Sequence, residues 1–237
     1  MKEKPYFSLF GPAIRPHFYE DAYNSVAANT DIPFEMVFVG YEPPTKTMPD
    51  NFRYIYSEAC PAECWDMAAR ESKADLLIST ADDLRYSKNF LNRAYHYTTV
   101  LDLNKTLIAF RYFIQWGVSY QGVSVDGGMF YDQGVPLSTV LGASGIFRKD
   151  LWVKLGGLDK RFSGSFADID LTLRFYNELR MSIFIPPDCS LIELDLPPAV
   201  MGSNLLHRSN PRPLLDSLWV RDGKFSTKRL LPVESFV

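Results

Sequence analysis

Short apolar runs alternate with helical patterns along most of the 237 residues, and this alternation constrains the fold more than any other feature. Residues 6–10 and 34–39 read as strands, each followed by a loop that contains glycine and proline. Between them, Phe18, Ala22 and Val26 recur every fourth residue, which is typical of an amphipathic helix. Strands and helices at this spacing predict βαβ units and a sheet that is covered on both faces.

The pattern continues through most of the chain, and it weakens in two places. Residues 117–142 are rich in glycine and aromatics, which is typical of a meandering sheet or a long functional loop. From residue 196 the tail is rich in Pro, Ser and Arg, and we expect extended segments there. We therefore expect a single α/β domain over residues 1–237, Rossmann-like, with a mixed, mostly parallel central sheet flanked by helices. Further strands are expected at residues 53–56, 76–79, 106–113, 145–147 and 182–185, and helices at 62–72, 88–102, 149–155 and 167–178.

Composition and charge exclude several classes of protein. Lys and Arg number 25 and Asp and Glu 28, so the formal net charge is −3, whereas a nucleic-acid-binding surface is normally strongly basic. The apolar run near the N-terminus breaks at Gly11 and Pro12 and does not read as a signal peptide, and no segment approaches the ~20 apolar residues of a spanning helix. The sequence predicts no nucleic-acid partner and no transmembrane segment, and it leaves peripheral contact with a membrane open.

The three cysteines indicate a reducing compartment. An odd number in a chain of this length is not a disulfide framework, and we expect a cytoplasmic protein. Cys60 and Cys64 lie four residues apart, but a closed zinc site needs four ligands and no second close pair exists. Structural zinc is not expected.

An acidic pair, Asp82 and Asp83, follows the strand expected at residues 76–79. In open sheets with parallel strands, ligands bind at the carboxyl ends of the strands. Mg²⁺ or Mn²⁺ typically binds one or two carboxylates together with substrate phosphates. The pair is therefore a candidate metal site, although an acidic loop that caps the next helix is the simpler interpretation of the pair taken alone.

A second acidic cluster begins the helix expected at residues 167–178. Ile169, Leu173 and Tyr176 fall on one face of this helix, which leaves Asp168 and Asp170 in its first turn. The helix dipole stabilises acidic residues there by ~0.3–1 kcal/mol, which is a purely structural explanation. The functional explanation is a carboxylate that is held ionised and ready to accept a proton.

Together, the stretches STADDLRYSKNFL and LGASGIFRKDLWVKLGGLDKRFSGSFADIDLTLRF, downstream of a βαβ unit, resemble a family 2 glycosyltransferase with the GT-A fold. The resemblance covers residues 5 to about 188. The family's second pattern is a glycine, an aromatic–Arg pair, a helix, Gly-Gly-hydrophobic-Asp, an aromatic, and Glu-Asp-x-Asp-Leu-x-x-Arg. The matching residues here are Gly142, Gly145, Phe147-Arg148, Gly156-Gly157-Leu158-Asp159, Phe162, Ala167-Asp168-Ile169-Asp170-Leu171 and Arg174.

The resemblance implies a metal-dependent, inverting transfer of a hexose from a nucleoside-diphosphate sugar to a hydroxyl of a saccharide or glycoconjugate acceptor. Asp83 matches the carboxylate that binds Mn²⁺ or Mg²⁺, and Asp82 the one beside it that faces ribose and metal. Asp168 matches the catalytic base, and Arg15 lies where the family's nucleotide loop begins. His207 lies where many members place a further metal or phosphate ligand, although a lone histidine there is more often structural.

Several positions depart from the family pattern. Gly40 and Tyr41 replace an aspartate pair that reads the base, and Glu42 is a candidate substitute. Asp66 replaces the helix asparagine and is a candidate contact for the nucleotide sugar, while Thr80 and Ala167 replace an Asp and a Glu. Two alternatives therefore stay open. One is a catalytically inactive carbohydrate- or nucleotide-sugar-binding protein of this fold, and the other is a sugar nucleotidyltransferase, although residues 11–15 lack that class's glycine-rich phosphate loop.

The same resemblance divides the domain by substrate. Residues 1 to about 105 form the nucleotide-sugar-binding half, residues 106 to about 195 the acceptor-binding half, and residues 196–237 the tail. Aromatic side chains of the second half are candidates for stacking on sugar rings, and acidic ones for binding hydroxyls. The candidates are Trp116, Tyr120, Tyr131, Asp126 and Asp132, whereas Trp152, on a helix face, is expected in the core.

Overall fold

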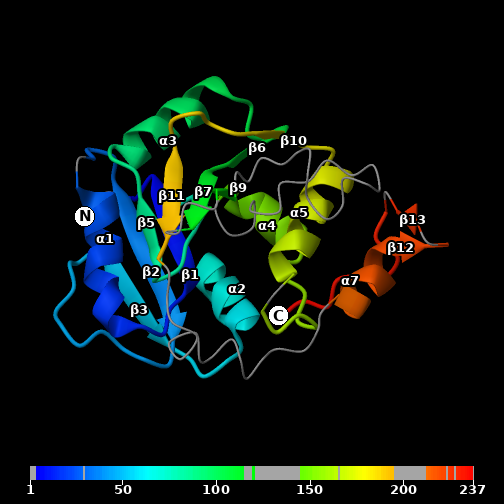
Figure 1. The fold of residues 1–237 in the computed structure, drawn as a ribbon, viewed down its shortest axis with the longest axis horizontal. Helices are drawn as coiled ribbons and strands as arrows, with labels where there is room; N and C mark the ends of the chain where they lie inside the picture. The colour runs from blue at the N-terminus through cyan, green and yellow to red at the C-terminus, as the bar shows by residue number, and fades with distance from the viewer. Residues whose placement is uncertain are drawn as a thin grey trace.

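A seven-stranded sheet forms the centre of the computed structural model (Figure 1), which describes residues 4–28, 30–114, 119–120, 145–164, 166–194, 212–222, 224–226 and 228–236. In spatial order its strands are β10 (Ser182–Phe184), β6 (Thr106–Ala109), β9 (Gly145–Arg148), β4 (Leu76–Ser79), β1 (Phe7–Pro12), β2 (Phe34–Gly40) and β3 (Phe52–Tyr56). Neighbouring strands run parallel except at β9, which is antiparallel to both β4 and β6. The expected α/β fold with a mixed, mostly parallel sheet is confirmed.

Alternation along the strands sends apolar side chains to both faces of this sheet. In β1, Phe7 and Leu9 belong to the hydrophobic cluster on one face, and Phe10 to the cluster on the other. Successive side chains of a strand point to opposite faces, so a strand that is buried on both faces is mostly apolar along its whole length. The first face is covered by α1 (Tyr19–Ala27) and α3 (Phe90–Val100), and the second by α2 (Pro61–Glu71), α4 (Lys149–Lys154), α5 (Ala167–Asn177) and α7 (Arg212–Trp219). A short 3-10 helix, η1 (Pro16–Phe18), precedes α1.

The segment expected as one strand at residues 106–113 forms two strands in two sheets. β6 ends at Ala109, and β7 (Arg111–Ile114) joins a second sheet with β11 (Ser190–Glu193), β5 (Leu84–Tyr86) and β8 (Ser119–Tyr120). Phe110 is fully buried at the switch, and its ring lies 4.6 Å from that of Phe90. Periodicity predicts neither β5 nor β11, because each is short and pairs with segments distant in the sequence.

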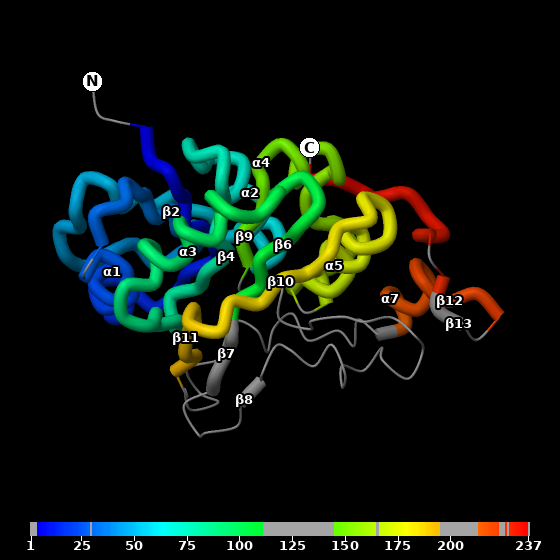
Figure 2. Tube along the Cα trace, turned by 90° about the horizontal axis from the view of Figure 1, so that it is seen from above, coloured from blue at the N-terminus to red at the C-terminus, as the bar shows by residue number. Residues whose placement is uncertain are grey.

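The expectation of an extended tail is wrong for residues 212–219, which form α7. Pro213 lies in its first turn, where the missing N–H costs nothing. Leu215, Leu218 and Trp219 are fully buried, and each large apolar side chain contributes about 1.5–3 kcal/mol on burial. The β12–β13 pair (Val220–Arg221 and Lys224–Phe225) follows, and Figures 1 and 2 place this region at the opposite end of the molecule from α1.

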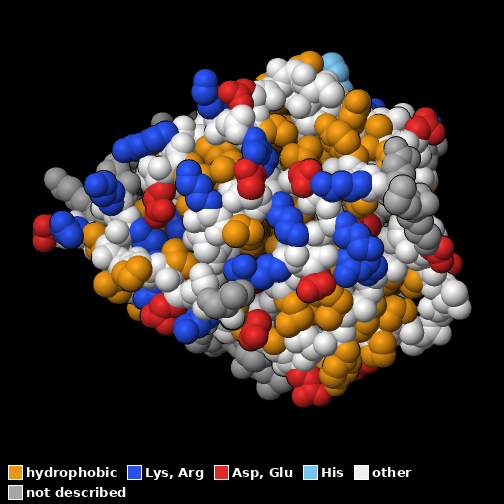
Figure 3. Space-filling model, turned by 180° about the vertical axis from the view of Figure 1, so that it is seen from behind, with side chains coloured by type: hydrophobic (Ala, Val, Ile, Leu, Met, Phe, Trp, Pro, Cys, Tyr) orange, Lys and Arg blue, Asp and Glu red, His pale blue; other side chains and the backbone are white. Residues whose placement is uncertain are grey.

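The molecular surface mixes charges of both signs. On the face opposite to that of Figure 1, Lys and Arg side chains gather across the middle with Asp and Glu beside them (Figure 3). Exposed ion pairs such as Lys4–Asp75 at 2.8 Å and Arg148–Asp150 at 2.6 Å contribute roughly 0–1 kcal/mol each. Within the part of the chain that the structure describes, no helix is long and apolar enough to cross a bilayer.

Candidate active site

The carboxyl ends of β4, β1 and β2 meet in a closely packed edge. In the sheet β1 lies between β2, which follows it in the sequence, and β4, so the strand order reverses at β1. Open α/β sheets bind ligands at such a reversal. A Cβ on Gly11 would lie 1.8 Å from the backbone oxygen of Thr80, and one on Gly40 would lie 1.9 Å from that of Ala13. The loop after β1 is therefore held between the loops after β4 and β2. This contact also explains why position 40 carries no aspartate, since a side chain there would displace the loop.

Asp82 fastens the acidic pair to the loop after β1. Its side chain is fully buried, and Oδ2 accepts hydrogen bonds from the backbone N–H groups of Ile14 at 2.8 Å and Arg15 at 2.7 Å. Oδ1 accepts from Nε of Arg15 at 2.9 Å and from its Nη2 at 2.5 Å. Hydrogen bonds to a charged group are roughly twice as strong as neutral ones, so Asp82 is fixed in place. It positions Arg15 and its own neighbour, Asp83.

Asp83 is the more accessible member of the pair. Its side chain is 14% exposed, against 0% for Asp82, and Oδ2 accepts one hydrogen bond from Nη2 of Arg15 at 2.8 Å. Burial raises the pKa of Asp83 to about 6, with Arg15 opposing the rise and the charges of Asp82 and Glu193 adding to it. Asp83 is therefore the member of the pair that is open to solvent at this edge.

Two charged residues beside the pair are not singled out by the sequence pattern. Arg85 donates from Nη1 to the backbone oxygen of Asp82 at 2.9 Å, and burial lowers its pKa. Glu193 comes from β11, which pairs with β5 so that Glu193 lies opposite Leu84. Arg85 could have been noticed because it lies two residues after Asp83. Glu193 could not, since only the pairing of β5 with β11 brings it close.

Asp168 lies in the first turn of α5, at the end where α5 approaches α2. The backbone N–H of Ala62 in α2 donates to the oxygen of Ser163 at 3.2 Å, and the chain enters α5 through Phe166 at φ 69°. A left-handed aromatic residue is a strained feature that often marks a functional site. Burial raises the pKa of Asp168 to about 6, although the backbone N–H groups of Ile169 and Asp168 oppose it. A carboxylate with such a pKa is ionised at neutral pH and is a stronger base than an ordinary one.

These raised pKa values predict a loss of stability as pH rises. In the folded chain Asp168 binds its proton more tightly than in the unfolded chain, where its pKa is 3.8. Its contribution to the free energy of unfolding is therefore complete below about pH 4 and is lost as pH rises through about 6. Between about pH 4.5 and pH 7.5 this amounts to about 2 kcal/mol, at 1.36 kcal/mol per pKa unit. Urea unfolding measures the free energy of unfolding at both pH values. The decrease in this free energy from pH 4.5 to pH 7.5 should be about 2 kcal/mol smaller in Asp168→Asn than in the natural chain. An identical pH dependence in the two proteins would contradict it.

Asp66 lies inside the contact between α2 and α4. Its Oδ1 accepts from Nε1 of Trp152 and from the backbone N–H of Leu158, both at 3.0 Å, and its Oδ2 from Nε of Arg70 at 2.5 Å. The residue is 1% exposed. This carboxylate holds the two helices and the turn after α4 together, so its contacts favour a structural role over contact with a nucleotide sugar.

The other candidates are dispersed. Glu42 lies in the exposed loop after β2, and its backbone oxygen accepts a hydrogen bond from Oη of Tyr19 at 2.8 Å. Trp152 is buried in the core, as expected. The remaining ones lie where the structure describes no side chain, and their roles stay predictions: His207, Trp116, Tyr120, Tyr131, Asp126 and Asp132.

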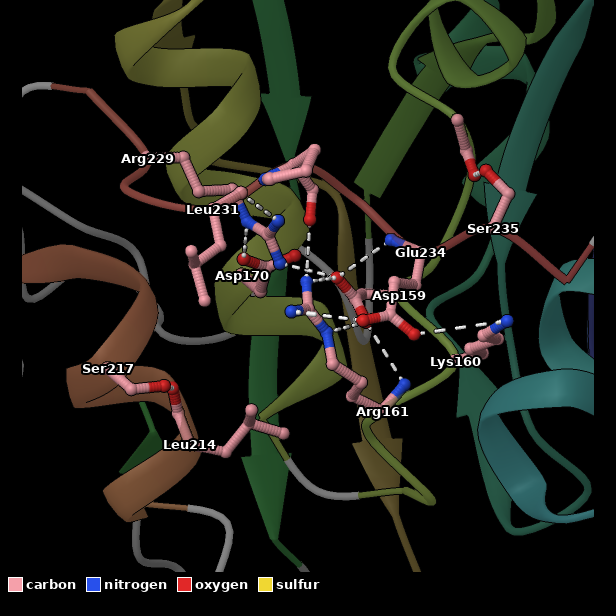
Figure 4. A network of polar contacts seen from close by, with 12 residues as sticks. Asp159, Lys160, Arg161, Asp170, Leu214, Ser217, Arg229, Leu231, Glu234 and Ser235 are labelled. Atoms are coloured by element: carbon pink, nitrogen blue, oxygen red, sulfur yellow. Dashed lines mark hydrogen bonds and ion pairs between the residues drawn. The ribbon is translucent and has the colours of Figure 1, made fainter.

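A buried ionic network ties α5 to the C-terminal segment (Figure 4). Arg229 donates from Nε to Oδ1 of Asp170 at 2.9 Å and from Nη2 to Oδ2 of Asp159 at 2.5 Å. Asp170 also accepts from Nε1 of Trp219 at 2.8 Å and from Nε of Arg174 at 2.9 Å. Both carboxylates are fully buried and the Arg229 side chain is 4% exposed. Arg229 therefore anchors the helix that carries Asp168, from a segment about sixty residues away.

The acidic pair fits a divalent ion that arrives with phosphate ligands. Among the described residues, no group of three or more His, Cys, Asp or Glu is arranged to hold a metal. Mg²⁺ and Mn²⁺ are commonly held by one or two carboxylates, with substrate phosphates and waters completing the shell. The guanidinium of Arg15, between Oδ1 of Asp82 and Oδ2 of Asp83, shows that a cation is accommodated there.

Comparison with known proteins identifies similar structures but no similar sequence family. No protein-family model and no curated protein matches the chain. Among solved structures, residues 1–349 of S. aureus TarS share 17% identity over 91% of this chain and 75% of that one, with a TM-score of 0.61. TarS in complex with UDP shares 16% identity over 81% of this chain and 61% of that one, with a TM-score of 0.59. TarS in complex with UDP-GlcNAc shares 14% identity over 81% of this chain and 59% of that one, with a TM-score of 0.57.

The chain spans about three fifths of the two TarS chains that were solved with ligands, and 38% of a longer TarS chain. Identities of this size establish a common architecture and nothing finer. The chain has the fold of S. aureus TarS.

Proposed function

We propose that this chain is a metal-dependent, inverting glycosyltransferase that moves a sugar from a nucleoside-diphosphate sugar to an acceptor hydroxyl. The observation that carries the proposal is the position of Asp82 and Asp83, in the short loop between β4 and β5 and fastened to the loop after β1. This is where an open sheet binds its ligand. TarS, which has the same fold, has been solved with UDP and with UDP-GlcNAc, which makes uridine-diphosphate sugars the first donors to test.

The proposal divides the chain by substrate. Residues 1 to about 105 bind the donor, with Glu42 as the candidate contact to the base. Residues 106 to about 195 bind a saccharide or glycoconjugate acceptor. A cytoplasmic location, where nucleotide sugars would be at hand, stays a prediction from the cysteine content.

The chemistry assigns one role to each of two carboxylates. Asp83 is the residue that would hold Mn²⁺ or Mg²⁺, and such an ion would neutralise the charge that develops on the departing diphosphate. Asp168 accepts the proton of the acceptor hydroxyl. The acceptor oxygen then forms a bond to the anomeric carbon, and the bond from that carbon to the diphosphate oxygen breaks, with its electron pair leaving on the diphosphate. A single displacement from the opposite face inverts the anomeric centre.

A thermal-shift panel of nucleoside-diphosphate sugars, with and without Mn²⁺, tests this assignment. A ligand at a hundred times its Kd stabilises the folded chain by about 2.7 kcal/mol. For a domain of this size each kcal/mol raises Tm by about 2–4 °C, so the donor with Mn²⁺ is expected to raise Tm by about 5–10 °C. No shift with any compound of the panel would contradict the proposal.

A pair of matched variants shows whether the thermal shift that depends on Mn²⁺ requires Asp83. Asp83→Asn should lose the part of the shift that depends on Mn²⁺, whereas Asp75→Asn should keep it, because Asp75 is 85% exposed and precedes β4 at its other end. Release of nucleoside diphosphate with Mn²⁺ separates the alternatives. A binding protein of the same fold would show the thermal shift without turnover, and a nucleotidyltransferase would release pyrophosphate from a nucleoside triphosphate.

A further inference from the structure

Arg15 occupies the position between two carboxylates that the proposed function gives to a metal ion. One of its nitrogens, Nη2, lies 2.5 Å from Oδ1 of Asp82 and 2.8 Å from Oδ2 of Asp83. The side chain is 15% exposed, so this contact is largely shielded from water. Two adjacent carboxylates repel each other, and the guanidinium offsets that repulsion while no other cation is present.

The two contacts of Arg15 differ in strength. Asp82 is bound at three points of Arg15, by the backbone N–H, Nε and Nη2, whereas Asp83 is bound only by Nη2. The contact with Asp83 can therefore break while Arg15 stays attached to Asp82. The guanidinium plane then keeps free N–H donors, in the fork geometry that suits a phosphate.

We propose that Arg15 is a displaceable internal cation. It holds Asp83 while no donor is bound, and it releases Asp83 to a divalent ion when a nucleoside diphosphate supplies phosphate oxygens for its freed N–H groups. This inference rests on the proposed function and adds a binding order to it. Divalent ion and nucleotide bind cooperatively, because Arg15 competes for Asp83 only when the diphosphate is absent.

The size of this coupling follows from linkage. Coupling between two ligands of one protein typically changes affinity about 5–150-fold, and reciprocally for the two ligands. The natural chain should therefore bind Mn²⁺ at least about tenfold more tightly with UDP than without it. Removing the competing guanidinium should raise the affinity for Mn²⁺ alone by a similar factor.

The experiment titrates free Mn²⁺ by electron paramagnetic resonance, with and without UDP, in the natural chain and in two variants. Arg15→Gln is expected to bind Mn²⁺ without UDP about tenfold more tightly than the natural chain. UDP should raise its affinity for Mn²⁺ by a factor about tenfold smaller than in the natural chain, because only the phosphate ligands of the ion still contribute. Arg148→Gln is the matched control, since Arg148 also forms a two-point pair with an aspartate, Asp150, at 2.9 and 2.6 Å on the surface. It should behave like the natural chain.

Three results would overturn the inference, and they are distinguishable from one another. Equal or weaker binding of Mn²⁺ by Arg15→Gln alone would show that Arg15 does not compete. Equal binding by the natural chain with and without UDP would remove the cooperativity and leave the proposed transferase intact. No binding of Mn²⁺ by the natural chain even with UDP would overturn both the inference and the metal dependence in the proposed function, and would leave Arg15 as the permanent cation of the site.

A second variant keeps the test decisive if Arg15→Gln does not fold. Arg15→Lys retains the charge beside Asp82, but a single ammonium cannot reproduce the planar contact with both carboxylates. It should also bind Mn²⁺ alone more tightly than the natural chain, by a smaller factor. Unchanged affinity in this variant would count against the inference in the same way.

Discussion

Asp168→Asn is expected to lower sugar transfer about 10²–10⁴-fold, the usual contribution of a general base. An amide of the same shape cannot take the proton of the acceptor hydroxyl. Burial raises the pKa of Asp168 to about 6, so the natural carboxylate is ionised at neutral pH and ready to accept that proton. Donor binding should survive, because the proposed diphosphate site consists of Asp82, Asp83 and Arg15 in the loops after β4 and β1, whereas Asp168 lies in α5.

The test of Asp168→Asn measures both sugar transfer and donor binding. Transfer is followed by release of nucleoside diphosphate under saturating donor, and donor binding by the thermal shift. Asp150→Asn is the matched control, since Asp150 lies in the first turn of another helix, α4, and is 60% exposed. It should leave turnover unchanged. Undiminished turnover in Asp168→Asn would exclude Asp168 as the base.

Arg229→Met is expected to lower the free energy of unfolding by about 3–5 kcal/mol, the usual result of removing one partner from a buried ion pair. Asp159 and Asp170 share Arg229 and are both fully buried. Burial alone would raise the pKa of Asp159, but hydrogen bonds from Arg161 and Arg229 hold it at about 2. The variant leaves each carboxylate with fewer cations in a region that water does not reach.

Urea unfolding at neutral pH measures this effect. Arg148→Met is the control, because it breaks an exposed pair with Asp150 that is worth about 0–1 kcal/mol. A loss below about 1 kcal/mol in Arg229→Met would show that Arg161 and Arg174 satisfy both carboxylates without it. The expected larger loss would show that the C-terminal segment is part of the stable fold that carries α5.

The central sheet could be predicted because its signal is local. Strands β1, β2 and β4 are mostly apolar runs, and the helices between them carry apolar residues at helical spacing. Each pattern lies within about a dozen residues, so no knowledge of distant contacts is needed. The positions of Asp83 at a strand end and Asp168 in a first helical turn follow from the same local patterns, and the structure confirms both positions.

Local patterns were misleading where a distant contact overrides them. The apolar run at residues 106–113 reads as one strand, yet Phe110 packs against Phe90 and the chain changes sheets there. The tail reads as extended, yet α7 buries Trp219, whose Nε1 donates to Asp170. In both places the energy gained by burial exceeds the local preference of the backbone.

The sequence by itself therefore determined the order along the chain of the central sheet's strands and of helices α1 to α5, and the position of the acidic residues along them. Only the tertiary structure decided which of those residues have a partner. It bound Asp66 between two helices, joined Arg15 to both members of the acidic pair, and brought Glu193 beside Asp83. The physical reason is that periodicity reports each segment's preference for a buried face, whereas charge pairing depends on how separate segments dock, which no single stretch of the chain specifies.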